Sequence, residues 1–254
     1  MKGGVITIGN EILKGRTVNT NAAEIGRVMY FSGYEVFRGI VVPDDPQEIA
    51  YAFRECLNVC DVIISSGGLG PTFDDMTIPA FAKAFNLDLK LDDYYYNRIK
   101  ESFSRLGLPM TEERKKMAMI PENSTPIENN VGSAPGIECT IQGKRVFILP
   151  GVPAEMRSML KVIGKKIKLS DSFYSEKSIV VKGIYESTIS PLVKRIMREH
   201  GNDVYIKTHP GMENGVSVIE IEVSAKSKRE DEAEKNAENV LKEIEEECRK
   251  LSNP

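Results

Sequence analysis

A glycine-rich segment followed by two aspartates is the part of the sequence best suited to chemistry. It reads GGLGPTFDD over residues 67–75, directly after the apolar run DVIIS at residues 61–65 and before a helical pattern. Glycine lets the backbone approach a ligand closely, and the N-terminus of the next helix favours an anion. The segment is neither a Walker A loop nor a dinucleotide fingerprint. We predict a phosphate-binding loop. Its ligand-contacting residues are Gly67, Gly68, Gly70 and Thr72.

Two adjacent carboxylates, those of Asp74 and Asp75, close this loop. Beside a phosphate they would repel the ligand unless a cation lay between them, and oxygen ligands of this kind suit Mg²⁺. We therefore predict a divalent metal site at Asp74 and Asp75. The simpler alternative is that one aspartate caps the following helix and the other has no role there.

Polar side chains also gather after the first apolar run, VITI at residues 5–8. Residues 9–21 offer a carboxylate, two cations and several amides, which suit ribose hydroxyls and phosphate. The residues assigned to ligand binding are Asn10, Lys14, Asn19 and Asn21, with Glu11 as the carboxylate. Taken alone, the segment is as readily explained as an ordinary connecting loop.

Two further strand ends are expected at the same edge of the sheet. Asp44 ends the strand expected over residues 36–42, while its neighbour Asp45 is better explained as a helix cap. Gly151 follows the apolar run at residues 146–149 and precedes a helix, again a place where an anion can bind. Ligands of open parallel sheets bind at the carboxyl ends of the strands. We therefore expect these four strand ends to form one site.

The elements that must position these residues follow an alternating pattern. Over the first 168 residues, short apolar runs alternate with amphipathic stretches, which predicts an α/β fold with a parallel sheet. Residues 21–24 (NAAE) have the form of a capping box, and Asp45 with Pro46 opens the next helix. Residues 9–15 are expected to be a loop. A second looped stretch is marked by Pro121, Pro126 and Pro135.

The polar residues 170–173 interrupt this pattern, and we place a domain boundary there. Beyond it, the residues are patterned as a strand, a helix, two strands and a final helix. The charged run at residues 243–247 is expected to be the solvated face of that last helix. This order fits a second, smaller α+β domain over residues 174–254.

Composition excludes several classes of protein. The chain has 254 residues, a net charge of −3 and an isoelectric point near 5.7, so it has no general attraction for nucleic acid or anionic membranes. Four cysteines do not make a disulfide framework at this size, and with only two histidines a closed zinc site is not expected. The sequence shows neither a signal peptide nor an apolar run of membrane-spanning length. We expect a cytoplasmic protein.

The sequence resembles the CinA (competence/damage-inducible protein A) family. The matching stretches are IGNEILKGRTVNTNA, VVPDD, SSGGLGPTFDDMT, TEERKKMAMIPENS, NNVGSAPG and LPGVPAEM, in order from residue 6 to about residue 156. The resemblance implies a three-layer α/β/α fold of the MoaB/Mog type over residues 1–169, binding a nucleotide or molybdopterin. It implies a KH-like α+β domain over residues 174–254.

The resemblance also implies an activity, the metal-dependent hydrolysis of ADP-ribose to AMP and ribose 5-phosphate. Asp75 aligns with the aspartate that closes the Mog-type glycine loop, and Asp44 aligns with that group's Pro-Asp motif. Asp74 and Asp75 would hold Mg²⁺ or Co²⁺, with K⁺ as a further candidate ion, and a metal-activated water would attack phosphorus. Glu11 or Asp44 would orient that water. A homo-oligomer is expected from the family.

The chain departs from the family pattern at three points. It stops at Pro254, so we expect it to lack the further domain that deamidates nicotinamide mononucleotide in many bacterial members. Residue 10 is Asn where the family has Thr. The KH-like region has no basic GxxG loop, so RNA binding does not follow from the fold.

Two other functions would use the same residues. One is a Mog-like adenylyltransferase or molybdopterin-binding protein. The other is a module that binds a phosphorylated nucleotide-like small molecule without turning it over. The sequence alone does not choose among these and the hydrolase.

Overall fold

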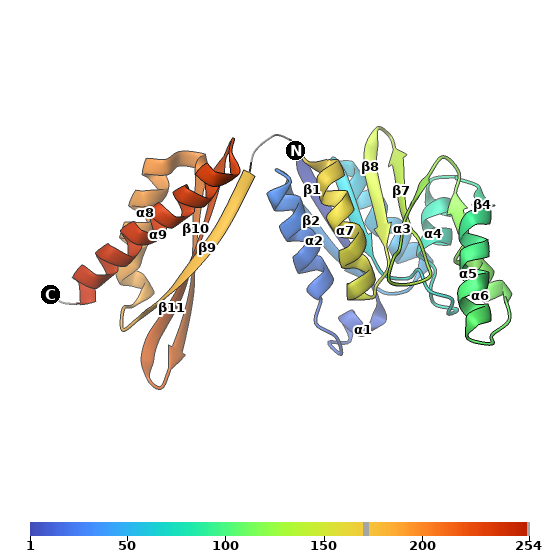
Figure 1. Cartoon of the computed structure of the whole chain (residues 1–254), viewed down its shortest axis with the longest axis horizontal. Coiled ribbons are helices and arrows are strands. Elements are labelled where there is room, and N and C mark those ends of the chain that lie inside the picture. The colour runs from blue at the N-terminus through green and yellow to red at the C-terminus, as the bar shows by residue number, and fades with distance from the viewer. Residues whose placement is uncertain (170–172, 253–254) are drawn as a thin grey trace. The chain divides into compact units, whose positions relative to one another are not determined.

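The computed structural model describes residues 1–169 and 173–252. It separates the chain into two compact units, Met1–Leu169 and Ser170–Pro254 (Figure 1). Of the predicted boundary at residues 170–173, residues 170–172 lie outside the described part of the chain. The first unit carries every residue that the sequence assigns to a site.

A six-stranded sheet forms the centre of the first unit, in the order β2-β1-β3-β8-β7-β6. The four strands from β2 to β8 run parallel, and β7 and β6 run antiparallel to their neighbours. This confirms the predicted mostly parallel α/β fold. The strands are β1 (Lys2–Ile8), β2 (Glu35–Val42), β3 (Val62–Ser66), β6 (Thr125–Ile127), β7 (Gly136–Ile141) and β8 (Lys144–Leu149).

Helices cover both faces of this sheet, which gives three layers (Figure 1). The helices of one face are α3 (Pro46–Val59) and α4 (Thr77–Ala84), and those of the other are α2 (Thr20–Phe31) and α7 (Pro153–Ile167). Successive strand residues point to opposite faces. Ile63 therefore belongs to the core with α3 and α4, whereas Ile64 belongs to the core with α2 and α7.

Helix α3 begins as predicted. The Asp45 side chain accepts hydrogen bonds from the backbone N–H groups of Gln47 and Glu48 at 2.8 and 3.1 Å, and Pro46 occupies the first turn. The predicted cap of α2 is wrong. Asn19, not Asn21, accepts the capping hydrogen bond, from the backbone N–H of Ala22 at 3.1 Å. Asn21 lies within the helix and is buried.

Two segments predicted to be loops contain regular structure. Residues 9–15 include a single helical turn, α1 (Asn10–Leu13). The proline-marked stretch includes β6 and the short strand β5 (Met119–Pro121). Both strands lie at sheet edges, where proline is tolerated because its missing N–H is not needed for pairing.

A separate substructure lies between α4 and β6. Its elements are β4 (Leu89–Leu91), α5 (Asp93–Arg105), α6 (Glu112–Lys116) and β5. It has a small core of its own, in which Tyr95, Ile99 and Ala118 are buried. This substructure supplies α6, which contacts the glycine loop described below.

The second unit is a three-stranded antiparallel sheet, in the order β10-β11-β9, with two longer helices. Its elements are β9 (Phe173–Lys182), α8 (Glu186–His200), the short helix η1 (Gly201–Asp203), β10 (Val204–Glu213), β11 (Val216–Ser227) and α9 (Glu230–Ser252). The predicted strand-helix-strand-strand-helix order is confirmed. Asn214 and Gly215 form the hairpin turn with positive φ angles of 50° and 81°.

All four cysteines are buried as thiols. Burial raises the pKa of the Cys56 and Cys139 thiols to about 12. Cys60 lies in the same core as these two, and Cys248 lies in the core of the second unit. Among the described residues, none of the helices is long and apolar enough to cross a membrane.

Candidate functional site

The four predicted strand ends meet at one pocket of about 530 Å³. Its wall includes Glu11 after β1, Asp44 after β2, residues of the loop 67–75 after β3, and Gly151 after β8. The strands are parallel neighbours, so their carboxyl ends lie at the same edge. Side chains far apart in the sequence therefore share this pocket.

The glycine loop needs glycine because the end of β1 and the start of α4 approach it closely. Gly67 and Gly68 have positive φ angles of 115° and 69°. A Cβ on Gly67 would lie 2.0 Å from the backbone oxygen of Ile8, and one on Gly68 would lie 2.2 Å from Thr77 Oγ1. Thr77 is buried and its hydroxyl donates to the Gly67 oxygen at 2.8 Å. The loop backbone is therefore held in one conformation.

Beyond the glycines, residues 72–75 form a turn closed by several bonds. The backbone N–H of Asp75 donates to the Thr72 oxygen at 3.2 Å, and the backbone N–H of Thr72 donates to Asp75 Oδ2 at 2.8 Å. The Thr72 hydroxyl lies 2.6 Å from Asp75 Oδ2 and also contacts Asp74 Oδ1. One hydroxyl proton cannot serve both carboxylates, so two acidic groups share a single donor.

Neither aspartate caps helix α4, so the capping interpretation is wrong. The N-cap residue is Met76, which makes no side-chain capping bond. Asp75 packs instead against the loop, where a Cβ on Gly70 would lie 2.5 Å from Asp75 Oδ2. The hydrogen bond from Thr72 lowers the pKa of Asp74. This hydrogen bond favours the ionised form of Asp74, which is the form that binds a cation.

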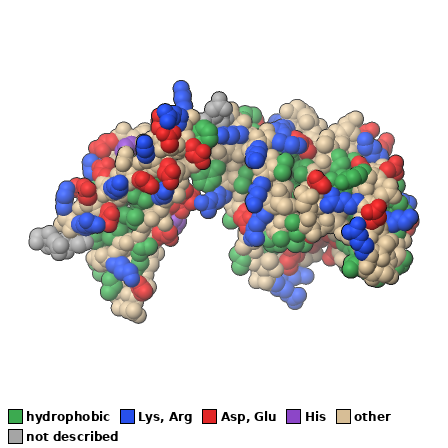
Figure 2. Space-filling view, in the orientation of Figure 1, with side chains coloured by type: hydrophobic (Ala, Val, Ile, Leu, Met, Phe, Trp, Pro, Cys, Tyr) green, Lys and Arg blue, Asp and Glu red, His purple; other side chains and the backbone are tan. Residues whose placement is uncertain are grey.

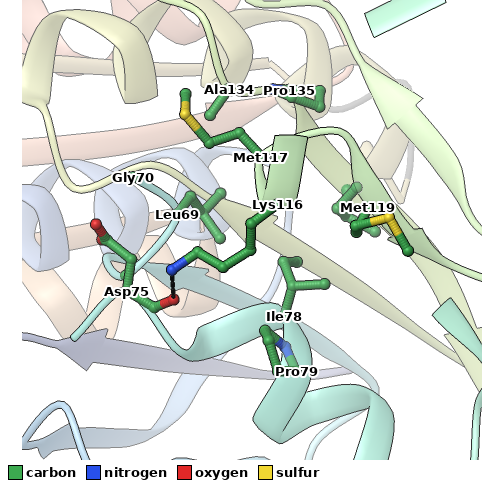
Figure 3. Close-up of a pocket in the computed structure, with 12 residues that line it drawn as sticks. Leu69, Gly70, Asp75, Ile78, Pro79, Lys116, Met117, Met119, Ala134 and Pro135 are labelled. Carbon is green, nitrogen blue, oxygen red and sulfur yellow. Dashed lines mark hydrogen bonds between the residues drawn. The ribbon is translucent and has the colours of Figure 1, made fainter. Parts of the chain in front are cut away.

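Lys116 holds this turn from outside and was not identified from the sequence. Its ammonium group donates to the backbone oxygens of Thr72 and Asp75 at 2.7 and 2.9 Å. Figure 3 shows Lys116 reaching the Asp75 backbone oxygen while the Asp75 carboxylate points away from it. Helix α6 of the separate substructure supplies this lysine. A lysine in an EERKK run carries no local signal of such a contact.

Asp44 faces other acids across the pocket. Its Oδ2 accepts the backbone N–H of Asn10 at 2.9 Å, which is how Asn10 takes part in the site. Burial raises the pKa of Asp44, and the charges of Glu11, Asp74 and Asp75 raise it further against the lowering effect of that hydrogen bond. The pocket therefore concentrates negative charge beside the glycine loop.

A smaller recess of about 80 Å³ adjoins the pocket. Asn19 and Asn21 line this recess rather than the main pocket. The Asn19 amide is engaged with Thr7 at 3.1 Å in addition to its capping bond, and Asn21 Nδ2 donates to the Gly151 oxygen at 2.8 Å. Lys14 is exposed at the C-terminal end of α1 and lines neither cavity.

Another part of the pocket wall depends on Asn129, a second residue that was not identified from the sequence. Asn129 is fully buried, and its Nδ2 donates to the Ala134 oxygen at 2.8 Å and to Glu155 Oε2 at 2.7 Å. Its Oδ1 accepts the backbone N–H groups of Val131 and Gly132. This amide therefore fixes the loop at residues 131–134, which lines the pocket.

In the parts of the chain that the structure describes, no group of three or more His, Cys, Asp or Glu side chains is arranged to hold a metal ion. Asp74 and Asp75 nevertheless offer carboxylate oxygens side by side at the pocket. Mg²⁺ commonly binds to one or two carboxylates and completes its shell with water and substrate phosphates. The donor set thus fits an ion that arrives with a phosphorylated ligand.

The chain is similar to a protein family, to a protein of nearly the same length and to a solved structure. A family model described as a probable molybdopterin binding domain matches residues 4–169. A protein from Caldivirga maquilingensis is 47% identical over 245 residues, which cover 96% of this chain and 95% of that protein. The crystal structure of the protein CinA, of unknown function, from Thermoplasma acidophilum is 54% identical, with a TM-score of 0.62. The match covers 65% of this chain and 97% of that one.

Proposed function

Because the chain belongs to the family of probable molybdopterin binding domains, we propose that its first unit binds a phosphorylated pterin-like or nucleotide-like small molecule. The observation that carries the proposal is the meeting of four strand ends at one pocket of about 530 Å³. That volume lies within the range of sites for small molecules and cofactors. The glycine loop would hold the phosphates through its backbone N–H groups.

Five carboxylates line this pocket, those of Glu11, Asp44, Asp74, Asp75 and Glu155, so a phosphate would enter it with a divalent cation. Asp74 and Asp75 would hold Mg²⁺ or Co²⁺ together with the ligand's phosphate oxygens, and K⁺ is a further candidate. The ion would neutralise charge on the phosphates. Lys116 would keep the turn that carries both aspartates in place, since it donates to both ends of residues 72–75.

Molybdopterin binding, with or without adenylyl transfer, is the function that the family favours. Hydrolysis of a diphosphate such as ADP-ribose is the second candidate. The observation that favours it is the raised pKa of Asp44. A carboxylate with a raised pKa is a better general base near neutral pH than an ordinary one. In this reaction Asp44 would take a proton from water as the water oxygen bonds to phosphorus. The diphosphate P–O bond would break to give AMP and ribose 5-phosphate.

We further propose that the chain is a CinA-type protein whose second unit is KH-like. The family motifs run through the first unit, and the crystallised CinA from Thermoplasma acidophilum is 54% identical to this chain where the two match. The strand-helix-strand-strand-helix order of the second unit supports a KH-like assignment. The net charge of −3 supports small-molecule ligands over nucleic acid.

Two incubations separate the candidate reactions. The full chain is given ADP-ribose with Mg²⁺ or Co²⁺ in one, and molybdopterin with ATP and Mg²⁺ in the other, and products are identified by chromatography. Release of AMP only in the first selects the hydrolase, and pyrophosphate release only in the second selects adenylyl transfer. Tight binding by calorimetry with intact ligand selects a binding module. Binding of none of these ligands contradicts the proposed site.

Asp75→Asn tests the metal assignment within this experiment. We expect metal-dependent turnover to fall by about 100-fold or more, since a charged ligand of the ion is lost. The matched control is Asp88→Asn, which changes an exposed aspartate outside the pocket and should leave turnover unchanged. Equal activity of Asp75→Asn and the unmodified protein would show that Asp75 does not hold the ion.

A further inference from the structure

The sheet of the second unit has two edges that differ in how well they are protected. In the order β10-β11-β9, β10 lies at one edge and β9 at the other (Figure 1). An edge strand presents a row of backbone N–H and C=O groups with which another strand can pair. β10 contains Pro210, which has no N–H, followed by Gly211. Both residues weaken strand pairing, so the β10 edge is a poor site for a further strand.

β9 lacks these features. Its residues, FYSEKSIVVK, include neither proline nor glycine and are rich in aromatic and β-branched side chains, which favour strands. The whole strand pairs with β11 in continuous register, so no bulge twists its edge away. Among the strands that the structure describes, β9 pairs with β11 alone. The outer side of β9 is therefore suited to pairing with one further strand.

The two faces of β9 differ in their surroundings. Ile179 packs against the core of the unit, on the face covered by helices, whereas Val180 is 58% exposed on the other face. Lys177 lies on the same face as Ile179, and its ammonium group pairs with Glu234 and Glu238 of α9 at 2.9 and 3.2 Å. A strand added beside β9 would therefore meet a lysine whose charge is already paired.

The charges of β9 are complementary to those of a second β9 that runs in the opposite direction. In two copies related by a two-fold axis perpendicular to the sheet, residues opposite each other lie on the same face. Because side chains alternate between faces, the axis must then pass through a residue and not between two residues. An axis at Ile179 places Glu176 of each copy opposite Lys182 of the other. An axis at Glu176 or Lys177 would instead place like charges opposite each other.

We propose that a second copy of this chain pairs with the β9 edge, in antiparallel orientation and with the two-fold axis at Ile179. The segments 176–182 of the two copies pair, and the two three-stranded sheets join into one continuous sheet. One strand from each copy makes a small interface, so the association is weak and depends on concentration. This inference concerns the second unit and is independent of the ligand proposed for the first.

Reversal of the two charges tests both the partner and the register. Glu176→Lys or Lys182→Glu alone places like charges opposite each other, whereas an equal mixture of the two variants restores both opposite pairs. Sedimentation equilibrium of the full chain measures the association. We expect each variant alone to associate about tenfold more weakly than the unmodified protein, and the mixture to recover the unmodified affinity. An interface elsewhere on the chain would be the same in every sample and could not produce this pattern.

A second measurement does not depend on charge. Ser178→Cys and Val180→Cys change two exposed positions that lie opposite each other in this register. Chains carrying one change each, mixed and oxidised with copper phenanthroline, should form a disulfide-linked pair. The control for both measurements is the exposed Lys207 on β10. Lys207→Glu should leave association unchanged, and Lys207→Cys should not cross-link to Val180→Cys. A monomeric unmodified protein, a mixture of charge variants that associates no better than its components, or no cross-link overturns the inference.

Discussion

In the pocket of the first unit, acidic side chains lie near other acidic side chains. On the surface of the second unit, acidic side chains pair with basic ones. Asp44 faces Glu11, Asp74 and Asp75, and its pKa is raised first by burial and then by these charges. Lys182 in the second unit pairs with Glu213 at 2.6 Å. Figure 2 shows acidic and basic side chains interspersed over that unit. Exposed pairs contribute little to stability, whereas clustered carboxylates oppose it. Clustered carboxylates in the pocket are expected where a cationic or metal-bound ligand binds, whereas paired charges on the second unit need only solvent around them.

Glycine substitutions should give the largest contrast between the units. Gly67→Ala puts a Cβ 2.0 Å from the Ile8 oxygen at a φ of 115°, so we expect the free energy of unfolding of the first unit to fall by more than about 3 kcal/mol. Gly183→Ala in the second unit also has a positive φ, but nothing lies within 4 Å of the added atom. Its cost should be about 1 kcal/mol. Urea unfolding measures both, and equal losses would contradict the close approach.

Lysine substitutions should give a smaller contrast. Lys116→Met removes both bonds to the turn at residues 72–75, and we expect phosphorylated ligands to bind about tenfold more weakly by calorimetry. Lys115→Met is the control, since Lys115 forms its ion pair within the described residues with the exposed Glu112 and not with the turn. Lys182→Met should change the free energy of unfolding by less than about 0.5 kcal/mol. Unchanged ligand affinity in Lys116→Met would show that ligand binding does not depend on the two hydrogen bonds from Lys116 to the turn.

The pH dependence of stability should differ in sign between the two units. This effect should be smaller than those of the glycine and lysine substitutions. The raised pKa of Asp44 means that its contribution to stability is present at low pH and lost as pH rises through that pKa. The pKa of Glu213 is lowered by Lys182, so its contribution is present at higher pH and lost as pH falls.

Melting temperatures between about pH 3 and pH 7 test this difference. Relative to the unmodified protein, Asp44→Asn should become more stable as pH rises, and Glu213→Gln should become less stable. Trends of the same sign in the two variants would mean that burial and the neighbouring carboxylates do not raise the pKa of Asp44.

Features set by neighbouring residues could be predicted from the sequence. Asp45 caps α3 through residues two and three positions away, and Pro46 marks the same helix start. The meeting of four strand ends followed from the alternation of strands and helices, because parallel strands share one carboxyl edge. The catalytic assignments to Glu11, Asp44 and Asp75 remain predictions.

Features set by distant residues could not be predicted. Asn21 rather than Asn19 was assigned to the cap of α2, but Asn21 bonds to Gly151, 130 residues away. Lys116 bonds to Thr72, 44 residues away, through a substructure whose packing the sequence pattern does not specify. The prolines at residues 121 and 126 predicted a loop, but they lie in β5 and β6. Both are edge strands, which tolerate proline, whereas inner strands do not.

The buried thiols make the opening of each unit measurable. Only a thiolate reacts with alkylating reagents, and burial raises the pKa of the thiols in both units. Labelling therefore requires local unfolding that exposes the sulfur. Cys56, Cys60 and Cys139 report on the first unit and Cys248 on the second. Mass spectrometry of labelled peptides would thus give two opening rates from one unmodified chain, and a ligand of the pocket should slow only the first.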